Sequence, residues 1–232
     1  MASRRDADRL IASGSVRVNG RVPPPDGMLV DAETDRVTVD ERRVEATTGG
    51  RWLAFNKPLG VITTARDPEG RSTVLELVPP EHRVGRLFPV GRLDADTTGL
   101  LLLTDDGDLA NRLAHPAHKV PKEYVAAVRG VPGERDLRLL RDGVQLVDGR
   151  TAPAEAELVS ARGRVGQVRI VIREGRNRQV RRMLEAIGHP AQALTRTAVG
   201  PIRLGRLRTG GWRRLRPAEI ESLRQASGLA GR

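Results

Sequence analysis

The chain has 232 residues and no cysteine, which suits one ordinary domain plus a small one and excludes disulfides, thiolate metal sites and a cysteine nucleophile. Its formal net charge of +11 points to a polyanionic partner. Residues 1–6 turn polar at once, and no apolar run approaches the ~18 residues of a membrane span, so we expect a cytoplasmic protein that is neither exported nor bound to a membrane.

Residues 1–46 read as a unit of their own, a short helix followed by a hairpin. Ser3 and Asp6 have the spacing of a capping box, and the apolar residues that follow share one helical face until Gly14 ends the helix. Residues 16–22 alternate apolar and polar around an Asn-Gly turn, and residues 37–39 read as a further strand.

This pattern resembles the alpha-L RNA-binding module of a small-subunit ribosomal protein, in its Ser-Arg-Arg helix start and its Val-x-Val-Asn-Gly strand and turn. We therefore place Arg4, Arg5 and Asn19 among the RNA-binding residues. The family pattern has a preceding helix that is absent when the chain starts at Met1, so we expect a truncated module or a misplaced start. A small helix-hairpin cap on the main domain is the alternative.

A linker of Thr and Gly at residues 47–50 leads into a second domain of mixed α and β structure, which we bound at 50–232. Helices are expected near 108–114, 134–141, 177–187 and 217–226. Strands are expected from Trp52 to Phe55 and near 61–64, 99–104, 123–128, 154–160, 167–173, 192–198 and 201–204.

A charged, hydroxyl-rich loop at residues 91–98 runs directly into a fully apolar strand, so Asp94 is expected at a sheet edge beside buried structure. Arg92, two residues earlier, is well placed to keep this carboxylate charged. An Asp that merely caps a turn is the more common alternative on composition alone. Lys57, in the turn after the first strand of this domain, fits an RNA contact and a solvated turn residue equally well.

The excess positive charge is concentrated in residues 161–216, which hold fifteen Arg against two acids. A basic region of this kind is typical of nucleic-acid binding, and no amphipathic apolar face accompanies it to suggest a membrane surface. A GC-rich coding bias would explain why 37 of the 40 basic residues are Arg, but it exchanges Lys for Arg without changing the net charge.

Within this basic region, one strand and one helix each divide into an apolar and a basic face. In the strand, Val168, Ile170 and Ile172 alternate with Gln167, Arg169 and Arg173, so one face can pack while the other meets RNA phosphates. The following helix is expected to begin at an Asn177 N-cap and to end at Gly188. It buries its apolar residues and presents Arg178, Arg181 and Arg182.

Five motifs in order resemble those of the RsuA/RluB-type ribosomal RNA pseudouridine synthases, over nearly the whole chain. They lie at residues 56–60, 91–107, 122–124, 174–183 and 200–205. The resemblance implies an α+β catalytic domain built on a mixed, largely antiparallel sheet with flanking helices. It also implies that Asp94 is the nucleophile, that Tyr124 stacks on the target base and that Arg181 pairs with the Asp. Many relatives carry His where this chain has Arg178.

The chemistry fits these residues. An Asp is ionised at pH 7 and needs no activating base, and a flipped-out uracil is stacked by an aromatic ring such as Tyr124, the one Tyr among five aromatic residues. A half-buried strand tyrosine is the alternative for Tyr124. Asp96, two residues beyond Asp94, is expected to matter much less. No phosphate loop or dinucleotide fingerprint occurs, and His115 with His118 lacks further ligands, so we expect no metal and no organic cofactor.

We therefore expect a monomeric enzyme that isomerises a specific uridine of ribosomal RNA, free or in a pre-ribosomal particle, with the large subunit favoured over the small. Arg92, Lys57, Arg176, Arg178 and Arg182 are the expected RNA contacts of the catalytic domain. A non-catalytic ribosome-assembly factor of the same fold and a base-removing glycosylase are the alternatives. The sequence leaves open whether the carboxylate attacks the base or the ribose.

Overall fold

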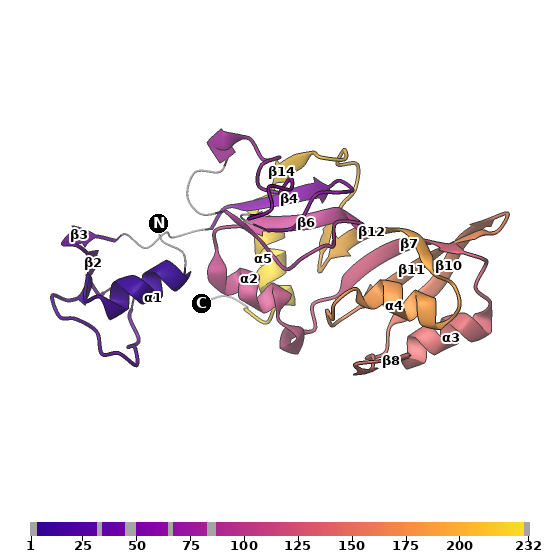
Figure 1. The fold of residues 1–232 in the computed structure, drawn as a ribbon, viewed down its shortest axis with the longest axis horizontal. Coiled ribbons are helices and arrows are strands. Elements are labelled where there is room, and N and C mark those ends of the chain that lie inside the picture. Colours follow the sequence, from indigo (N-terminus) through magenta and orange to yellow (C-terminus); the bar gives the residue numbers. More distant parts are fainter. Residues whose placement is uncertain (1–3, 32–33, 45–49, 65–66, 83–86, 230–232) are drawn as a thin grey trace. The chain divides into compact units, whose positions relative to one another are not determined.

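The computed structural model describes residues 4–31, 34–44, 50–64, 67–82 and 87–229. It divides into two compact units, Met1–Gly50 and Arg51–Arg232 (Figure 1). Among the helices in the described ranges, none is long and apolar enough to cross a membrane.

The N-terminal unit is one helix and a three-stranded antiparallel sheet: α1 (Arg4–Ala12), β1 (Val16–Val18), β2 (Val37–Val39) and β3 (Arg42–Arg43), in the sheet order β1-β2-β3. The expected Asn-Gly turn is present, because Asn19 and Gly20 both have positive φ, 50° and 82°, and Val18 and Arg21 exchange backbone hydrogen bonds across them. Ser3, the expected start of the capping box, lies outside the described residues.

The second unit is built on a nine-stranded sheet with the order β10-β11-β7-β12-β6-β4-β14, to which β13 adds beside β12 and β5 beside β6. Its strands are β4 (Trp52–Lys57), β5 (Phe88–Pro89), β6 (Thr98–Thr104), β7 (Lys122–Arg129), β10 (Glu155–Arg162), β11 (Val165–Ile172), β12 (Ala191–Val199), β13 (Ile202–Arg203) and β14 (Trp212–Arg214). Every pairing is antiparallel except that of β12 with β6, which is parallel. The expected mixed, largely antiparallel sheet is therefore confirmed.

Helices cover both faces of this sheet. They are α2 (Gly107–Ala114), α3 (Glu134–Asp142), α4 (Gln179–Ala186) and α5 (Pro217–Ala226), with short 3-10 turns at Pro80–His82 and Pro116–His118 and a small β8 (Gln145–Leu146) and β9 (Gly149–Arg150) ribbon. Figure 1 shows α2 and α5 beside the β4–β6 half of the sheet and α3 and α4 beside the β7–β10–β11 half.

The buried core forms two clusters, one on each side of the sheet, because alternate residues of β4 and β6 point to opposite faces. Leu101 and Leu103 belong to the cluster that includes the buried residues of α3 and α4, whereas Leu100 and Leu102 belong to the cluster that includes those of α2 and α5. All four leucines are fully buried. The apolar run that follows the Asp94 loop is thus a buried central strand, β6, which anchors the C-terminal end of this loop.

Two local expectations were wrong, and one strand was not predicted. The strand expected at 61–64 is a single bridge between Ile62 and Thr73, and the Thr63 hydroxyl donates to the backbone carbonyl of Leu93. The helix expected from Asn177 begins at Gln179, since Arg178 has a left-handed backbone with φ 49° and provides no side-chain cap. The sequence analysis also missed β14, whose Trp-Arg-Arg sequence lacks the alternation that predicts a strand.

Candidate active site

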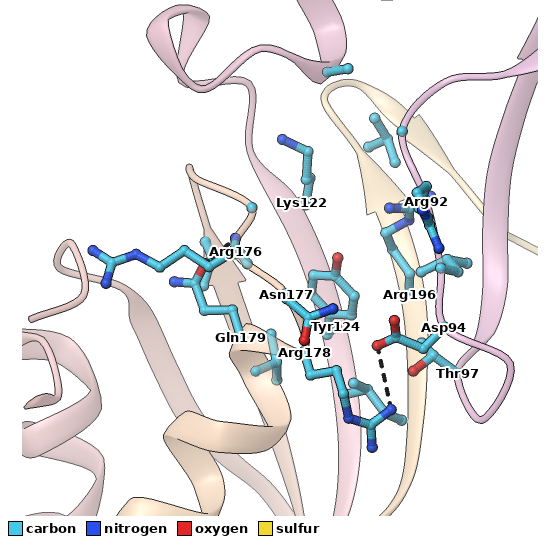
Figure 2. A pocket seen from close by; sticks show the side chains of 18 of the residues that line it. Arg92, Asp94, Thr97, Lys122, Tyr124, Arg176, Asn177, Arg178, Gln179 and Arg196 are labelled. Atoms are coloured by element: carbon cyan, nitrogen blue, oxygen red, sulfur yellow. Dashed lines mark hydrogen bonds and ion pairs between the residues drawn. The ribbon is translucent and has the colours of Figure 1, made fainter. Parts of the chain in front are cut away.

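A cavity of about 410 Å³ opens on the second unit between the Asp94 loop, strands β7 and β12, and the turn that leads into α4 (Figure 2). Asp94, Tyr124 and Arg178 all line it, although they come from three separate parts of the chain. Pockets that gather a few polar side chains in this way are the usual location of an active site.

The Asp94 loop is fixed by hydrogen bonds to the segment that follows β4. The hydroxyl of Thr63 donates to the carbonyl of Leu93 at 2.7 Å and accepts from its amide at 3.2 Å, and Thr63 itself is buried. The amide of Gly60 donates to the carbonyl of Ala95 at 2.8 Å. The loop is thereby held against the sheet on the side away from the cavity, which limits the positions that Asp94 can take.

Lys57 lies beneath this loop and is fully buried, so its assignment as an RNA contact was wrong, as was the alternative of a solvated turn residue. Its Nζ donates to the carbonyls of Pro58 at 2.9 Å and Ala95 at 3.4 Å. Burial lowers the pKa of Lys57 to about 8, and the nearby carboxylates of Asp96 and Asp94 oppose this shift. Lys57 therefore supports the loop from the interior of the domain.

Asp94 lies at the wall of the cavity with about a third of its side chain exposed (34%). The guanidinium nearest to it is that of Arg178, with Nη1 3.7 Å from Oδ2, as the dashed line in Figure 2 marks. Arg178 also binds both carboxylate oxygens of Asp96, at 3.0 and 2.8 Å. These hydrogen bonds from Arg178 lower the pKa of Asp96, so the loop carries a fixed negative charge beside Asp94.

The structure does not pair Arg181 with Asp94. Instead Nη2 of Arg181 donates to the carbonyl of Asp96 at 2.5 Å, and its Nε lies 3.3 Å from the Asp96 carboxylate. The left-handed turn at Arg178 explains the difference, because it directs the Arg178 side chain towards Asp94 while the first turn of α4 places Arg181 under the loop backbone. The pairing expected for Arg181 is thus corrected to Asp96.

Tyr124 lies near the start of β7 and is largely buried, with 8% of its surface exposed. Its ring faces the cavity between the Asp94 loop and Asn177, as Figure 2 shows. In the sheet it pairs with Ile170 of β11 on one side and with Arg196 of β12 on the other. The strand pairing therefore fixes the ring close to Asp94, which the sequence could not show.

Three more residues of the second unit were expected to contact RNA. Arg92 has no ion pair among the described residues, whereas Arg176 and Arg182 both bind other groups of the protein. Arg92 is exposed at the cavity. Arg176 instead donates to the carbonyls of Asp148, Gly149 and Arg150, at 3.2, 2.9 and 2.6 Å. Arg182 binds both carboxylate oxygens of Asp148, at 2.9 and 3.0 Å. Arg176, in the turn before α4, and Arg182, in α4, therefore hold the β8–β9 ribbon, and their contact with RNA stays a prediction.

In the N-terminal unit, the side chain of Asn19 is also used internally. Its amide donates to the carboxylate of Asp35 at 2.7 Å, and its carbonyl accepts from the amide of Arg36 at 2.8 Å. Asn19 thus organises its own hairpin. Arg4 and Arg5 lie in the first turn of α1, but their side chains fall outside the described residues.

Lys122 and Arg196 also line the cavity, and the sequence analysis assigned no role to either. A signal for Arg196 was available, because it alternates with Leu194 and Ala198 on the inward face of an expected strand. Arginine is rarely buried unless it is paired, so an arginine among apolar residues on a buried face indicates a partner or a ligand.

Comparison with known proteins agrees with this geometry. The family model described as RNA pseudouridylate synthase matches residues 51–186. An uncharacterized RNA pseudouridine synthase of Aquifex aeolicus is 43% identical over 232 residues, covering 99% of this chain and 91% of the relative. The ribosomal large subunit pseudouridine synthase B of Bacillus subtilis is 44% identical over 226 residues, covering 97% and 91%. A solved structure described as a pseudouridylate synthase matches with a TM-score of 0.71 at 30% identity, covering 95% of this chain and 94% of that one. The chain therefore belongs to the RNA pseudouridylate synthase family and is a pseudouridine synthase.

Proposed function

We propose that this enzyme isomerises a uridine of ribosomal RNA, in the large subunit, and that Asp94 is its catalytic carboxylate. The name of the Bacillus subtilis relative, together with its 44% identity over almost the whole chain, supports this substrate. The observation that carries the assignment of Asp94 is geometric. Among the described residues that line the cavity, Asp94 is the one carboxylate, and it shares this cavity with Tyr124 and the guanidinium of Arg178.

The reaction breaks the bond between N1 of uracil and C1′ of the ribose, turns the base, and joins C5 of the base to C1′. The proton on C5 is lost and N1 ends protonated, so the mass of the RNA is unchanged. An ionised carboxylate can act as the nucleophile in this sequence, either on the ribose or on the base, and then as the base that removes the C5 proton. The partly exposed Asp94 carboxylate faces the cavity in which this base would lie.

Tyr124 is suited to stack on the flipped-out uracil, because its ring is held by two neighbouring strands and faces the cavity. Arg178 is the residue that we assign to pair with Asp94, and Arg181 is the residue that positions the loop through the Asp96 carbonyl. Arg92, exposed at the cavity, is assigned to contact the RNA backbone.

A base-removing glycosylase would use the same base flipping but would release free uracil, so the product distinguishes the two reactions. Ribosomal RNA as substrate also implies a cytoplasmic enzyme that acts on free RNA or on a pre-ribosomal particle. We propose that it does so as a monomer.

The test maps pseudouridines in ribosomal RNA from a strain that lacks the gene. One pseudouridine, in the large-subunit RNA, should be missing, and the wild-type protein should restore it while Asp94→Asn should not. The control is Asp142→Asn, because Asp142 is exposed at the end of α3 and does not line the cavity. A complete set of pseudouridines in the deletion strain would refute the substrate, and restoration by a folded Asp94→Asn protein would refute the nucleophile.

A further inference from the structure

One end of the cavity carries positive charge that the protein itself does not balance. Five cationic residues line the cavity, against the single carboxylate of Asp94, and they are Arg92, Lys122, Arg176, Arg178 and Arg196. Arg176 and Arg178 are occupied by carboxylates and carbonyls. No carboxylate of the described residues pairs with Lys122 or Arg196, so their charges remain available to a ligand.

Arg196 is the more deeply placed of the two, with 3% of its surface exposed. Its Nε donates to the carbonyl of Leu100 at 2.7 Å, which holds the side chain against β6. Its Nη2 is buried and has no hydrogen-bond partner among the described residues. Burying a guanidinium with a donor unpaired is costly, so a fold retains it where a ligand completes the hydrogen bonds.

Lys122 faces the same cavity from the neighbouring strand. Lys122 precedes Tyr124 by two residues in β7, so the two side chains lie on the same face of the sheet. Arg196, in the neighbouring strand β12, pairs directly with Tyr124. The Nζ of Lys122 donates to the carbonyl of Val120, at 3.4 Å. Burial and the nearby charge of Arg196 lower the pKa of Lys122 to about 8, which an approaching anion would reverse.

The nearest acidic residue in sequence does not neutralise this pair. Glu123 points to the opposite face of β7, where it binds Arg169 at 2.8 Å and the hydroxyl of Thr197 at 2.8 Å. The alternation of the strand therefore separates Glu123 from Lys122, and no carboxylate in the described ranges pairs with the two cations on the cavity face.

We propose that Lys122 and Arg196 form an anion subsite that binds a backbone phosphate of the RNA next to the target uridine. This inference rests on the proposed function, because it takes the uridine to lie against Tyr124 and Asp94. A phosphate suits the subsite better than a uracil carbonyl does, since two uncompensated positive charges favour an anion over a neutral oxygen. The subsite would fix the ribose of the nucleotide on which Asp94 acts.

The scarcity of lysine allows a direct test. The chain has three lysines, Lys57, Lys119 and Lys122, so reductive dimethylation with carbon-13 gives a simple NMR spectrum in which the Lys122 signal is assigned from the Lys122→Gln spectrum. Dimethylation keeps the positive charge. Uridine 3′,5′-bisphosphate should shift the Lys122 signal and raise the pKa of Lys122, while uridine should not. The exposed Lys119 should respond little to either.

Steady-state kinetics provide a second test of the anion subsite. On the RNA that the mapping experiment identifies, Lys122→Gln should raise KM by about tenfold or more with a smaller change in kcat, and Lys119→Gln should leave both unchanged. An unresponsive Lys122 signal, or equal responses to uridine and its bisphosphate, would overturn the subsite. Failure of the proposed function has a different signature, since the wild-type protein would then form no pseudouridine in ribosomal RNA whatever the NMR result.

Discussion

Asp94 and Asp96 lie two residues apart in one loop but have different partners. The carboxylate of Asp94 faces the cavity, with Arg178 at 3.7 Å, whereas Asp96 binds Arg178 through both oxygens and Arg181 through its carbonyl and its carboxylate. Asp96 is still expected to matter much less than Asp94, but its contacts give it a role of its own. Asp96 is a positioning residue that sets where the Arg178 guanidinium lies.

We predict that Asp96→Asn lowers the single-turnover rate by about tenfold, while Asp94→Asn abolishes turnover. If Asp96 acts through Arg178, the losses in Asp96→Asn and Arg178→Ala will not add in the double variant, because both remove the same ion pair. Single-turnover rates of the three proteins, with a thermal melt of each, measure this. Additive losses would show that Asp96 and Arg178 act separately.

Lys57 makes stability depend on pH in a predictable direction. Its pKa is about 8 in the folded protein and 10.5 for an unperturbed lysine, so between these values the unfolded chain binds more protons than the folded one. The penalty for burying the charge is complete below pH 8 and is relieved as the pH rises to 10.5. The unfolding free energy of the wild type, measured relative to Lys57→Met, should therefore increase by roughly 1–3 kcal/mol across this window.

Urea unfolding of both proteins at pH 7, 8, 9 and 10 checks this prediction. Lys119→Met serves as the control, because Lys119 is exposed and its replacement removes a lysine without removing a buried charge. A constant difference between wild type and Lys57→Met over the whole range would contradict the assignment of the shift to Lys57.

At the scale of elements, the parallel contact between β6 and β12 brings the Asp94 loop to Tyr124 and Arg196. Gly99 makes this contact possible, because it has φ 103° and a Cβ at this position would overlap the backbone oxygen and nitrogen of Arg196. A residue with a side chain there must push the two strands apart. The glycine that follows the loop in sequence is thus required by the sheet that supports the loop.

We predict that Gly99→Ala destabilises the protein by about 1–3 kcal/mol and lowers turnover, because it displaces Arg196 and the end of the Asp94 loop. Gly107→Ala is the matched control, since Gly107 starts α2 and a Cβ there meets nothing within 4 Å. Thermal melts and single-turnover rates of the two variants would give the comparison. Equal stability of both variants would show that β6 and β12 can separate at no cost.

At the scale of the whole molecule, fewer arginines of the basic stretch 161–216 are available to bind RNA than its composition indicates. Nine of its fifteen arginines pair with carboxylates, and they are Arg169, Arg173, Arg176, Arg178, Arg181, Arg182, Arg203, Arg213 and Arg216. Arg169 and Arg173, expected to meet RNA on the outer face of β11, bind Glu123 and Glu155 instead. The remaining six arginines, with Arg92 and Lys122, are the candidates for phosphate contacts.

We therefore predict that RNA affinity falls with salt, with a slope in log K against log salt of roughly −6, as about eight phosphate contacts would give. Fifteen free arginines would give roughly −10. A binding titration from low to physiological ionic strength measures the slope. A flat dependence would mean that this region does not meet the RNA backbone.

The two units should also have different functions, with the first contributing to RNA affinity and the second carrying out catalysis. Both core clusters lie within residues 52–229, so deleting residues 1–46 is expected to leave the catalytic domain folded. The truncated protein should bind RNA more weakly and still turn over a short RNA at high concentration, because every residue of the cavity is retained. Binding and single-turnover assays of the truncation test this. Loss of all turnover in a folded truncation would contradict it.

The sequence by itself determined the family, most elements of the fold, and Asp94 and Tyr124 as candidates for the active site. It could do so because ordered motifs, strand alternation and helix periodicity are local properties of the chain. The apolar run after the Asp94 loop, for example, predicted a buried strand, and it is the central strand β6.

The tertiary structure alone decided which charges meet. Arg178 and Arg181 reach Asp96 across 82 and 85 residues of chain, Lys57 turns inward under the loop, and Arg196 comes to lie beside Tyr124 through strand pairing. No local pattern encodes such partners, because an arginine on a strand or helix has the same propensity whether it meets a carboxylate, a carbonyl or a ligand. Its role is fixed by burial and by the neighbours that the fold supplies, since a buried charge must find a partner whereas an exposed one need not.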